Sequence, residues 1–350
     1  MDFFNSKIHS WYSFSKRDLP WRNTRNPYFI WLSEIILQQT RIDQGLSYYL
    51  RFIDEFPTIS DLANASEDQI LKLWQGLGYY SRARNLHFTA KYICLHFNGI
   101  FPDDYHSIRS LKGVGDYTAA AIASISFNLE YPAVDGNVYR VLSRFFGIPE
   151  PIDTNSGKKK FSKLAEELIK GTDPGMHNQA LMEFGALQCT PKNPDCKSCP
   201  LSESCFAFSE KKIGELPFKQ NKTKQRDRFF NYLVLTDVTH IWLRKRTGKD
   251  IWENLFEFPL IETTEETDID QLTGQNDFQE FVQTQQSVLE DISIWKIHIL
   301  SHQRIHYRFI RIQLSGEINM PRDLIRVNKQ DIFNFAVPKL LETYLNDYNN

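Results

Sequence analysis

The sequence lacks the long apolar segments that membrane proteins need. No run of eighteen or more apolar residues occurs in it, so we expect no transmembrane helix. Its first residues also lack a basic stretch followed by an apolar one, so we expect no signal peptide. These absences predict a cytoplasmic protein.

The chain also lacks a strong net charge, internal repeats and low-complexity tracts. A net charge of -2 over 350 residues does not by itself indicate a nucleic-acid-binding protein. Basic side chains nevertheless outnumber acidic ones over residues 211–250, between a near-neutral part and an acidic C-terminal part. Such a segment is typical of a solvated linker, and it becomes a DNA contact only if the flanking domains bind DNA.

Short helical patterns separated by glycine, proline and polar loops fill the first 210 residues. The predicted helices cover 3–14, 28–50, 60–65, 67–75, 81–97, 104–110, 116–127, 157–170 and 176–187, and another begins at 136. No strand pattern interrupts them. An all-α domain over 1–210 is therefore predicted, and the 41% of hydrophobic residues can fill its core.

The pattern changes after Cys205. A basic, turn-rich linker is predicted over 211–228, and an α+β domain over 229–350. Its predicted strands are 229–238, 241–246, 292–300 and 304–314, and its predicted helices are 270–288 and 330–346. The apolar phase of the last strand slips between Phe309 and Ile310, which predicts a β-bulge there.

A glycine turn leads into the helix predicted at 116–127. Gly113, Val114 and Gly115 form this turn, and glycines beside a helix N-terminus let backbone N–H groups approach an anion such as a DNA phosphate. A dinucleotide-binding fingerprint would need a third glycine where Thr118 stands, and a preceding strand. Asp135 begins the next helix, where an isolated aspartate is ordinarily an N-cap.

Four of the five cysteines lie in one short segment. They are Cys189, Cys196, Cys199 and Cys205. Disulfides are not expected in a cytoplasmic protein, which leaves a metal site with four thiolates. Zinc sites usually show two Cys-x-x-Cys-like pairs and only one occurs here, so an iron–sulfur cluster is favoured while zinc stays open. The fifth, Cys94, is predicted to lie in the core.

Three of these features resemble, in order and spacing, a known protein family. The hairpin LKGVGDYTAAAI, the AVDGNV segment and the Cys-x6-Cys-x2-Cys-x5-Cys loop are similar to those of helix-hairpin-helix DNA glycosylases of the iron–sulfur subgroup. The resemblance covers 1–210 and implies a six-helix lobe at 28–135 and an iron–sulfur lobe made of 1–27 and 136–210. It also implies that the four cysteines hold a [4Fe-4S] cluster that supports structure and DNA binding.

Departures from the family pattern also carry information. Lys112 stands where the family hairpin usually has proline, which leaves the glycine-dependent backbone approach intact. Sibling enzymes that cut the DNA strand carry a lysine nucleophile where this chain has Tyr117. Without that amine no Schiff base can form with the sugar, so a monofunctional, hydrolytic glycosylase is implied. Lys192 and Lys197, within the cysteine loop, are candidate phosphate contacts.

Within the family, the chain resembles the MutY-type adenine glycosylases. The SEIILQQTRI segment with Glu34 is similar to their catalytic glutamate motif, and the segments LPWR, LQQT and GLGYY match in order. The resemblance implies that Glu34 is a general acid that protonates adenine N7, with a pKa raised by burial. It implies that Asp135 stays ionised and stabilises or captures the oxocarbenium ion, after the adenine has been flipped out of the duplex.

Further roles follow from the same resemblance. Asn137 would hold the surroundings of Asp135, with Tyr117 beside the catalytic pair. Gln39 and Tyr79 would wedge into the base stack. The adenine pocket would be lined by Trp21, Arg22 and Glu183, the last on the weaker match ALMEFGALQC.

The C-terminal part resembles the Nudix-like domain with which MutY-type enzymes recognise 8-oxoguanine. The Arg-Glu-x-x-Glu-Glu run that holds metal in Nudix hydrolases does not occur, so no nucleotide hydrolase activity is expected. Leu300-Ser301-His302 matches the Phe-Ser-His loop of the family with leucine in place of phenylalanine. Ser301 and His302 are therefore the candidates for reading 8-oxoguanine.

The expected protein is a monomer that binds double-stranded DNA carrying adenine opposite 8-oxoguanine or guanine, and no membrane. One alternative is a sibling glycosylase for mismatched thymine or oxidised pyrimidines; Tyr117 argues against its lyase form. The other is a non-catalytic iron–sulfur DNA-binding protein, against which Glu34 and Asp135 argue.

Overall fold

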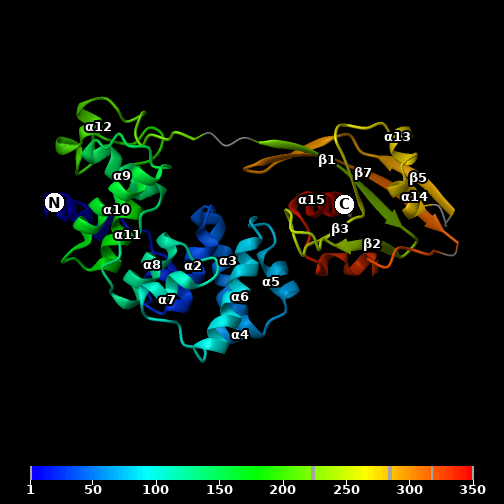
Figure 1. Ribbon diagram of the computed structural model, residues 1–350, viewed down its shortest axis with the longest axis horizontal. Helices are drawn as coiled ribbons and strands as arrows, with labels where there is room; N and C mark the ends of the chain where they lie inside the picture. The colour runs from blue at the N-terminus through cyan, green and yellow to red at the C-terminus, as the bar shows by residue number, and fades with distance from the viewer. Residues whose placement is uncertain (1, 222–224, 283–285, 317, 349–350) are drawn as a thin grey trace. The chain divides into compact units, whose positions relative to one another are not determined.

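The computed structural model describes residues 2–221, 225–282, 286–316 and 318–348, and it forms two compact units. The first unit consists of Met1–Asn64 with Asn85–Asn221, and the second of Ala65–Arg84 with Lys222–Asn350. The elements of each unit can be followed by colour along the chain in Figure 1. The segment Ala65–Arg84 thus groups with the C-terminal residues, although its sequence reads as part of a helical run.

Helices and loops make up the described part of the first unit, as the sequence predicts. The helices are α1 (Asp2–Ser15), α2 (Pro27–Leu37), α3 (Ile42–Glu55), α4 (Ile59–Asn64), most of α6 (Ser81–His96), α7 (Tyr105–Ser110), α8 (Asp116–Phe127), α9 (Gly136–Phe146), α10 (Asn155–Ile169), α11 (Pro174–Leu187) and α12 (Phe206–Ser209). Short 3-10 helices span Pro20–Arg22 and Ser202–Ser204. Among the described residues of the chain, no helix is long and apolar enough to cross a membrane.

The helix predicted over 28–50 is two helices. Asn26 caps the first by accepting a hydrogen bond from Tyr28 N at 2.9 Å, and Pro27 occupies its first turn. The chain then breaks after Leu37, where Gln39 adopts a left-handed φ of 56°, and α3 begins at Ile42. Periodicity missed this break because apolar residues continue on both sides of it. The break turns Gln39 outward at an exposed corner.

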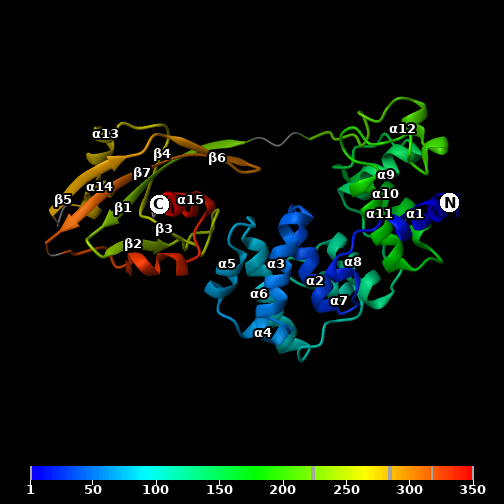
Figure 2. The same ribbon diagram turned by 180° about the vertical axis from the view of Figure 1, so that it is seen from behind.

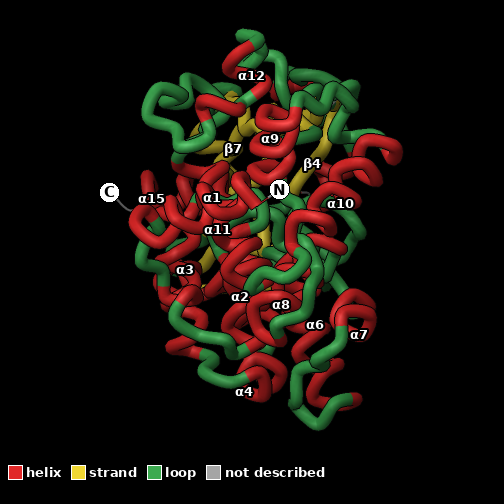
Figure 3. The backbone as a smooth tube through the Cα atoms, turned by 90° about the vertical axis from the view of Figure 1, so that its left-hand side faces the viewer, coloured by secondary structure: helices red, strands yellow, loops and turns green. Residues whose placement is uncertain are grey.

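Two helices near the middle of the first unit position its other elements. α8 is apolar around most of its circumference, and eight of its residues, from Thr118 to Ile125, are buried. It packs against α2, α7 and α11, and α11 in turn packs against α1, α9 and α10. Figure 3 shows α8, α11 and α9 in this arrangement. As a result, the glycine turn before α8 and the N-terminus of α9 face the same helix, α11.

The second unit is built on a mixed eight-stranded sheet. Its strands are β1 (Arg226–Thr236), β2 (His240–Lys245), β3 (Phe256–Glu257), β4 (Leu260–Thr263), β5 (Gln286–Ile292), β6 (Lys296–Ile299), β7 (Gln303–Ser315) and β8 (Leu324–Asn328). β1 and β7 run parallel at its centre, and the other pairings are antiparallel. The helices of this unit are α5 (Glu67–Trp74), α13 (Ile269–Thr273), α14 (Asn276–Val282) and α15 (Lys339–Tyr348), with a 3-10 helix at Lys329–Asn334.

Helices cover both faces of this sheet, which Figures 1 and 2 show from opposite sides. On one face, Leu233 and Ile310 belong to a core cluster with Phe278 of α14. On the other face, Tyr232 and the Tyr344 ring of α15 both stack on Phe309, with centroids 5.6 and 4.0 Å away. The central strands are therefore buried on both sides, which explains their nearly continuous apolar sequence.

The predicted bulge in the last strand is wrong. β7 keeps one register with β1 from Gln303 to Gln313, and both Phe309 and Ile310 are buried because each face has its own helix layer. The register shift lies in β5, between Leu289 and Asp291.

Other predicted boundaries in this unit also differ from the structure. The predicted helix 270–288 ends at Val282, and β5 begins at Gln286. The predicted strand 292–300 is shortened to β6, and the predicted helix 330–346 is interrupted between Asn334 and Lys339, where Pro338 stands. The short strands β3, β4 and β8 were not predicted, because two to five residues show no periodicity.

Candidate active site

A pocket of about 710 Å³ in the first unit gathers side chains from widely separated parts of the chain. It is bounded by the segment before α2, by α2, by the glycine turn, by the N-terminus of α9 and by α11. The predicted site residues that line it are Trp21, Arg22, Glu34, Gln39, Gly113, Gly115, Tyr117, Asp135, Asn137 and Glu183. Of the other predicted residues, Val114 is buried at 3% exposure, and its backbone N–H donates to the Leu111 carbonyl at 3.1 Å.

Glu34 reaches the pocket from the middle of α2, between residues whose side chains are fully buried. Burial raises the pKa of Glu34 to about 7; a hydrogen bond from Tyr117 acts against this shift, and the charge of Asp135 adds to it. A carboxyl group with this pKa is largely protonated at pH 6 and still partly protonated at pH 7.5. Glu34 can therefore donate a proton near neutral pH, which most glutamates cannot.

Asp135 is the N-cap of α9. Its Oδ1 accepts hydrogen bonds from Asn137 N at 2.9 Å and Val138 N at 2.8 Å, and its Oδ2 accepts one from Asn137 Nδ2 at 2.7 Å. Burial raises the pKa of Asp135 above its usual value, and these three donors act against that shift. The helix N-terminus and the N–H donors thus favour the anionic form of a carboxylate that protein otherwise surrounds.

Tyr117 lies close to both carboxyl groups. Burial first, then the charges of Glu34 and Asp135, raise the pKa of Tyr117 well above its usual value. Its hydroxyl contacts the Glu34 carboxyl and lies 3.1 Å from the Sδ atom of Met182 on α11. The phenol is therefore neutral and orients Glu34, and no amine stands at this position.

Glu183 holds two arginines at the pocket wall. Arg17 donates to it through Nε at 2.9 Å and Nη2 at 2.6 Å, and Arg22 through Nη1 at 2.9 Å and Nη2 at 2.6 Å. Burial tends to raise the pKa of Glu183, but the bonds from Arg17 and Arg22 outweigh it and lower the pKa to about 2. Glu183 is therefore anionic and positions the guanidinium groups.

Among the pocket residues that sequence reasoning missed, Arg17 and Met182 contact predicted ones, Glu183 and Tyr117. Arg17 lies two residues before the LPWR motif, and a basic residue beside a motif is a weak signal. Met182 precedes Glu183 in the weaker match. Trp21 serves two purposes, because its ring lines the pocket and also packs edge-on against Tyr49, with centroids 5.0 Å apart.

The glycine turn before α8 is held from two sides. Gly113 has a φ of +82°, and a Cβ atom there would lie 2.8 Å from the Cβ atom of Asn85, so only glycine fits without strain. Arg109 donates to the Val114 carbonyl at 3.1 Å and pairs with Asp116, and Thr89 donates to the Lys112 carbonyl at 2.9 Å. These contacts fix the backbone of the turn that leads into the N-terminus of α8.

The four clustered cysteines follow α11 and are free, half-buried thiols. Burial raises the pKa of Cys199 to about 11, and the charges of Cys189, Cys205 and Cys196 add to this shift. Arg144 Nη1 lies 3.5 Å from Cys189 Sγ. Among the described residues, no group of three or more His, Cys, Asp or Glu side chains is arranged to hold a single metal ion.

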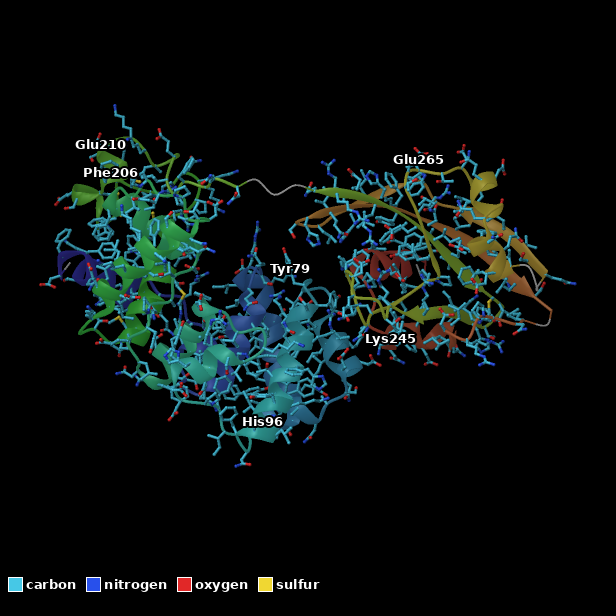
Figure 4. All side chains as sticks on the ribbon, viewed as in Figure 1. Tyr79, His96, Phe206, Glu210, Lys245 and Glu265 are labelled. Carbon is cyan, nitrogen blue, oxygen red and sulfur yellow. The ribbon has the colours of Figure 1, made fainter. Side chains whose placement is uncertain are left out.

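A smaller pocket, of about 320 Å³, lies in the second unit. It brings Tyr79, from the turn between α5 and α6, together with Ser301 and His302 of the β6–β7 hairpin. Tyr79 has a left-handed φ of 48° and a 47% exposed side chain, which Figure 4 labels. Ser301 Oγ lies 3.2 Å from His302 Nδ1, and the bond from Leu300 N to the Gln303 carbonyl at 2.8 Å closes the hairpin.

Two protein-family patterns match the chain. That of the HhH-GPD superfamily of base excision DNA repair proteins matches residues 32–170, and that of the NUDIX domain matches residues 231–347.

Curated proteins and solved structures show the same likeness. The chain is 38% identical over 321 residues to the adenine DNA glycosylase of Buchnera aphidicola subsp. Baizongia pistaciae, covering 89% of this chain and 86% of that protein. It is 39% identical over 298 residues to the adenine DNA glycosylase of Arabidopsis thaliana, covering 74% of this chain and 47% of that protein. A thermostable thymine-DNA glycosylase structure is 32% identical with a TM-score of 0.55, covering 59% of this chain and 95% of that one. An endonuclease III structure in complex with DNA, 21% identical with a TM-score of 0.53, covers 60% of this chain and 95% of that one and shares the fold.

Proposed function

Because the chain belongs to the adenine DNA glycosylases, within the HhH-GPD superfamily of base excision DNA repair proteins, we propose that it removes adenine mispaired with 8-oxoguanine or guanine. Base excision of adenine follows from the family itself. The observation that carries the proposal is a protonatable Glu34 and a hydrogen-bonded Asp135 in one pocket.

The proposed reaction begins with proton transfer. With the adenine flipped into the 710 Å³ pocket, Glu34 donates its proton to N7, and the bond between C1′ and N9 breaks with its electron pair leaving on the base. The pKa of about 7 supports this role, since the acid form is available near neutral pH. Tyr117 orients the Glu34 carboxyl and remains neutral.

The sugar cation is then stabilised by the second carboxylate. Asp135 faces the oxocarbenium ion as an anion or captures it at C1′, and a water molecule supplies the hydroxyl group of the product while its proton leaves to a base. Asn137 keeps Asp135 in place through its side-chain hydrogen bond at 2.7 Å. Because Tyr117 provides no amine, the sugar is not attacked by an amine at this position and the strand stays intact.

The adenine is recognised by other side chains of the pocket wall. Trp21, Arg22 and Glu183 line this wall, and Gln39, at the exposed left-handed corner after α2, is suited to fill space in the base stack. The glycine turn binds a phosphate through the backbone N–H groups of Gly113 and Gly115, while that of Val114 donates to the Leu111 carbonyl.

The 8-oxoguanine opposite the adenine is read in the 320 Å³ pocket of the second unit. Ser301 and His302 offer hydrogen-bonding groups there, and Tyr79 offers a partly exposed ring for stacking. Cys189, Cys196, Cys199 and Cys205 hold a [4Fe-4S] cluster that orders their loop for DNA binding. The exposed side chains of Lys192 and Lys197 in that loop contact phosphates, as does the basic 211–228 segment, of which 222–224 lie outside the described residues.

A glycosylase assay tests the proposal. Duplexes carrying A opposite 8-oxoguanine, G or T are incubated with the protein and analysed with and without alkali. We expect cleavage of the A strand only after alkali, fastest opposite 8-oxoguanine and absent opposite T. Cleavage without alkali would contradict the monofunctional mechanism, and no excision by a cluster-loaded protein would favour a non-catalytic DNA-binding role.

A further inference from the structure

The loop Asp250–Asn254 has an unusual backbone. Trp252 and Asn254, neither of them glycine, both adopt left-handed conformations, with φ of 59° and 65°. A bulky aromatic residue rarely adopts this conformation, and it persists only where surrounding contacts enforce it. Such strain is often found at ligand-contacting positions, so the contacts of this loop are informative.

Residues of the Ala65–Arg84 segment, which belongs to the same unit, bind this loop. Arg84 donates through Nη1 to the Glu253 carbonyl oxygen at 2.8 Å and through Nη2 to Glu253 Oε2 at 2.7 Å. Asn254 Nδ2 donates to Glu67 Oε1, and Asn254 N donates to the Arg246 carbonyl at 2.7 Å. One arginine therefore binds both the backbone and the side chain of the residue directly after Trp252.

The indole of Trp252 forms part of the pocket that contains Tyr79, Ser301 and His302. It is 9% exposed and lies with its ring centroid 6.3 Å from that of Phe230 and 6.0 Å from that of His298 on β6. β6 leads directly into the Ser301–His302 hairpin. Trp252 is thus an apolar wall of the pocket and also a support for the strand that carries its polar groups.

We propose that Trp252 is a specificity-determining residue that packs against the base opposite the target adenine, and that the Arg84–Glu253 pair positions it. This inference rests on the proposed function, because it assigns that base to this pocket. A flat wall restricts the plane in which a purine can lie, so that only a base with the right edge groups meets Ser301 and His302. Arg84 also lies five residues after Tyr79 in the chain. One short segment thus carries Tyr79 and the arginine that holds the loop with Trp252.

The test compares single-turnover excision rates on A:8-oxoguanine and A:G duplexes. Trp252→Ala should lower the ratio of the two rates about tenfold, the size of effect expected from losing one well-packed pocket contact. The rate on A:G should fall less than the rate on A:8-oxoguanine, because guanine gains less from the pocket. Trp252→Phe, which retains an aromatic ring, should keep most of the wild-type rate ratio.

Charge reversal tests the Arg84–Glu253 pair without removing the indole. Arg84→Glu and Glu253→Arg should each lower the rate ratio, and the double variant should recover only part of it, because it restores the ion pair but not the hydrogen bond to the Glu253 backbone carbonyl. Asp291→Asn on β5 is the matched control, because its side chain is 60% exposed and it does not line the pocket. Thermal unfolding of each variant shows that the variants compared are folded.

The outcomes separate this inference from the proposed function. A wild-type protein that excises adenine with a preference for 8-oxoguanine, together with variants that keep that preference, would overturn the role of Trp252 alone. Equal loss of both rates in Trp252→Ala would also overturn it, since that is the result of a purely structural role. A wild-type protein without excision or without preference would instead overturn the proposed function.

Discussion

Gly185 of α11 lies directly against Asn137 of α9, so that a Cβ atom at Gly185 would come within 2.6 Å of the Asn137 Cβ atom. Arg140 joins the two residues, because its Nη2 donates to Asn137 Oδ1 at 2.8 Å and to the Gly185 carbonyl at 2.6 Å. Asn137 in turn donates to Asp135 at 2.7 Å. The absence of a side chain at position 185 therefore permits the packing that holds Asn137 beside the Asp135 carboxylate.

Gly185→Ala should slow adenine excision at least about tenfold while the protein remains folded, because displacements of about 1 Å in a catalytic group have large effects on rate. The measurement is the single-turnover rate on an A:8-oxoguanine duplex, with the duplex affinity measured separately. Gly214→Ala is the control, since nothing lies within 4 Å of a Cβ atom at that position. A folded Gly185→Ala protein with the wild-type rate would show that Asn137 does not position Asp135.

Glu34→Gln should reduce the excision rate by about a hundredfold or more, the usual size of a general-acid contribution. Glutamine is nearly the same size and cannot donate the proton, so duplex affinity should change little. In the wild type the pKa of about 7 should make the rate fall as the pH rises above 7, because the acid form is lost. A rate that is flat from pH 6 to pH 9 would assign the proton to another group.

The same substitution should change stability in a pH-dependent way. Burial raises the pKa of Glu34 from 4.5 to about 7 in the folded protein, so the folded state binds its proton more tightly than the unfolded state. The free energy of unfolding therefore decreases between pH 4.5 and pH 7, by up to about 3 kcal/mol. Glu34→Gln should be more stable than the wild type at pH 8 and close to it at pH 4.5, as measured by urea denaturation. An equal difference at both pH values would contradict the raised pKa.

Glu183→Gln should destabilise the protein by about 3 kcal/mol at pH 7, because it leaves two guanidinium groups without their carboxylate. The low pKa of Glu183, about 2, means that its stabilising effect is present above pH 4.5 and is lost as the pH falls toward 2. The difference between variant and wild type should therefore shrink in acid. Asp116→Asn, which removes an exposed ion pair with Arg109, should leave stability near the wild-type value. A neutral effect of Glu183→Gln at pH 7 would show that Arg17 and Arg22 find other partners.

Cys199→Ser should abolish iron and sulfide incorporation, whereas Cys94→Ser should leave both unchanged, since Cys94 lies outside the cysteine loop. Iron, sulfide and zinc contents of the purified proteins, with visible absorption, provide the measurement. If the wild-type protein contained zinc and no iron, the four cysteines would hold zinc and not an iron–sulfur cluster. Loss of the cluster should also weaken duplex binding, because the loop that carries Lys192 and Lys197 would lose its organising ligands.

Much of the local structure followed from residues close together in the chain. The glycine turn, the Asp135 cap and the helices of the first unit depend on backbone preferences and neighbouring side chains, and the sequence predicts them. The break after Leu37, the short strands and the register shift in β5 were missed. They depend on which surfaces pack together, and periodicity does not contain that information.

The pocket residues divide in the same way, into those that the sequence predicts and those that depend on how distant segments pack. The sequence, through its resemblance to a family, named Glu34, Tyr117 and Asp135, and the structure brings them into one pocket. It gave no indication of Arg17 beside Glu183, of Gly185 against Asn137, or of Trp252 beside Tyr79. The residues of these pairs are separated by 166, 48 and 173 positions in the chain, so no local pattern brings them together.

By itself, then, the amino-acid sequence determined the chemical groups this protein has available: two carboxylates, a neutral phenol, four thiols, and glycines where the backbone must approach an anion. Only the tertiary structure decided what those groups can do. Whether Glu34 holds a proton at neutral pH depends on burial by helices from distant segments, and whether Glu183 is anionic depends on two arginines far from it in the chain. The reason is physical, because a side chain brings its own pKa and size, whereas desolvation, hydrogen bonding and neighbouring charge arise only when the chain has folded.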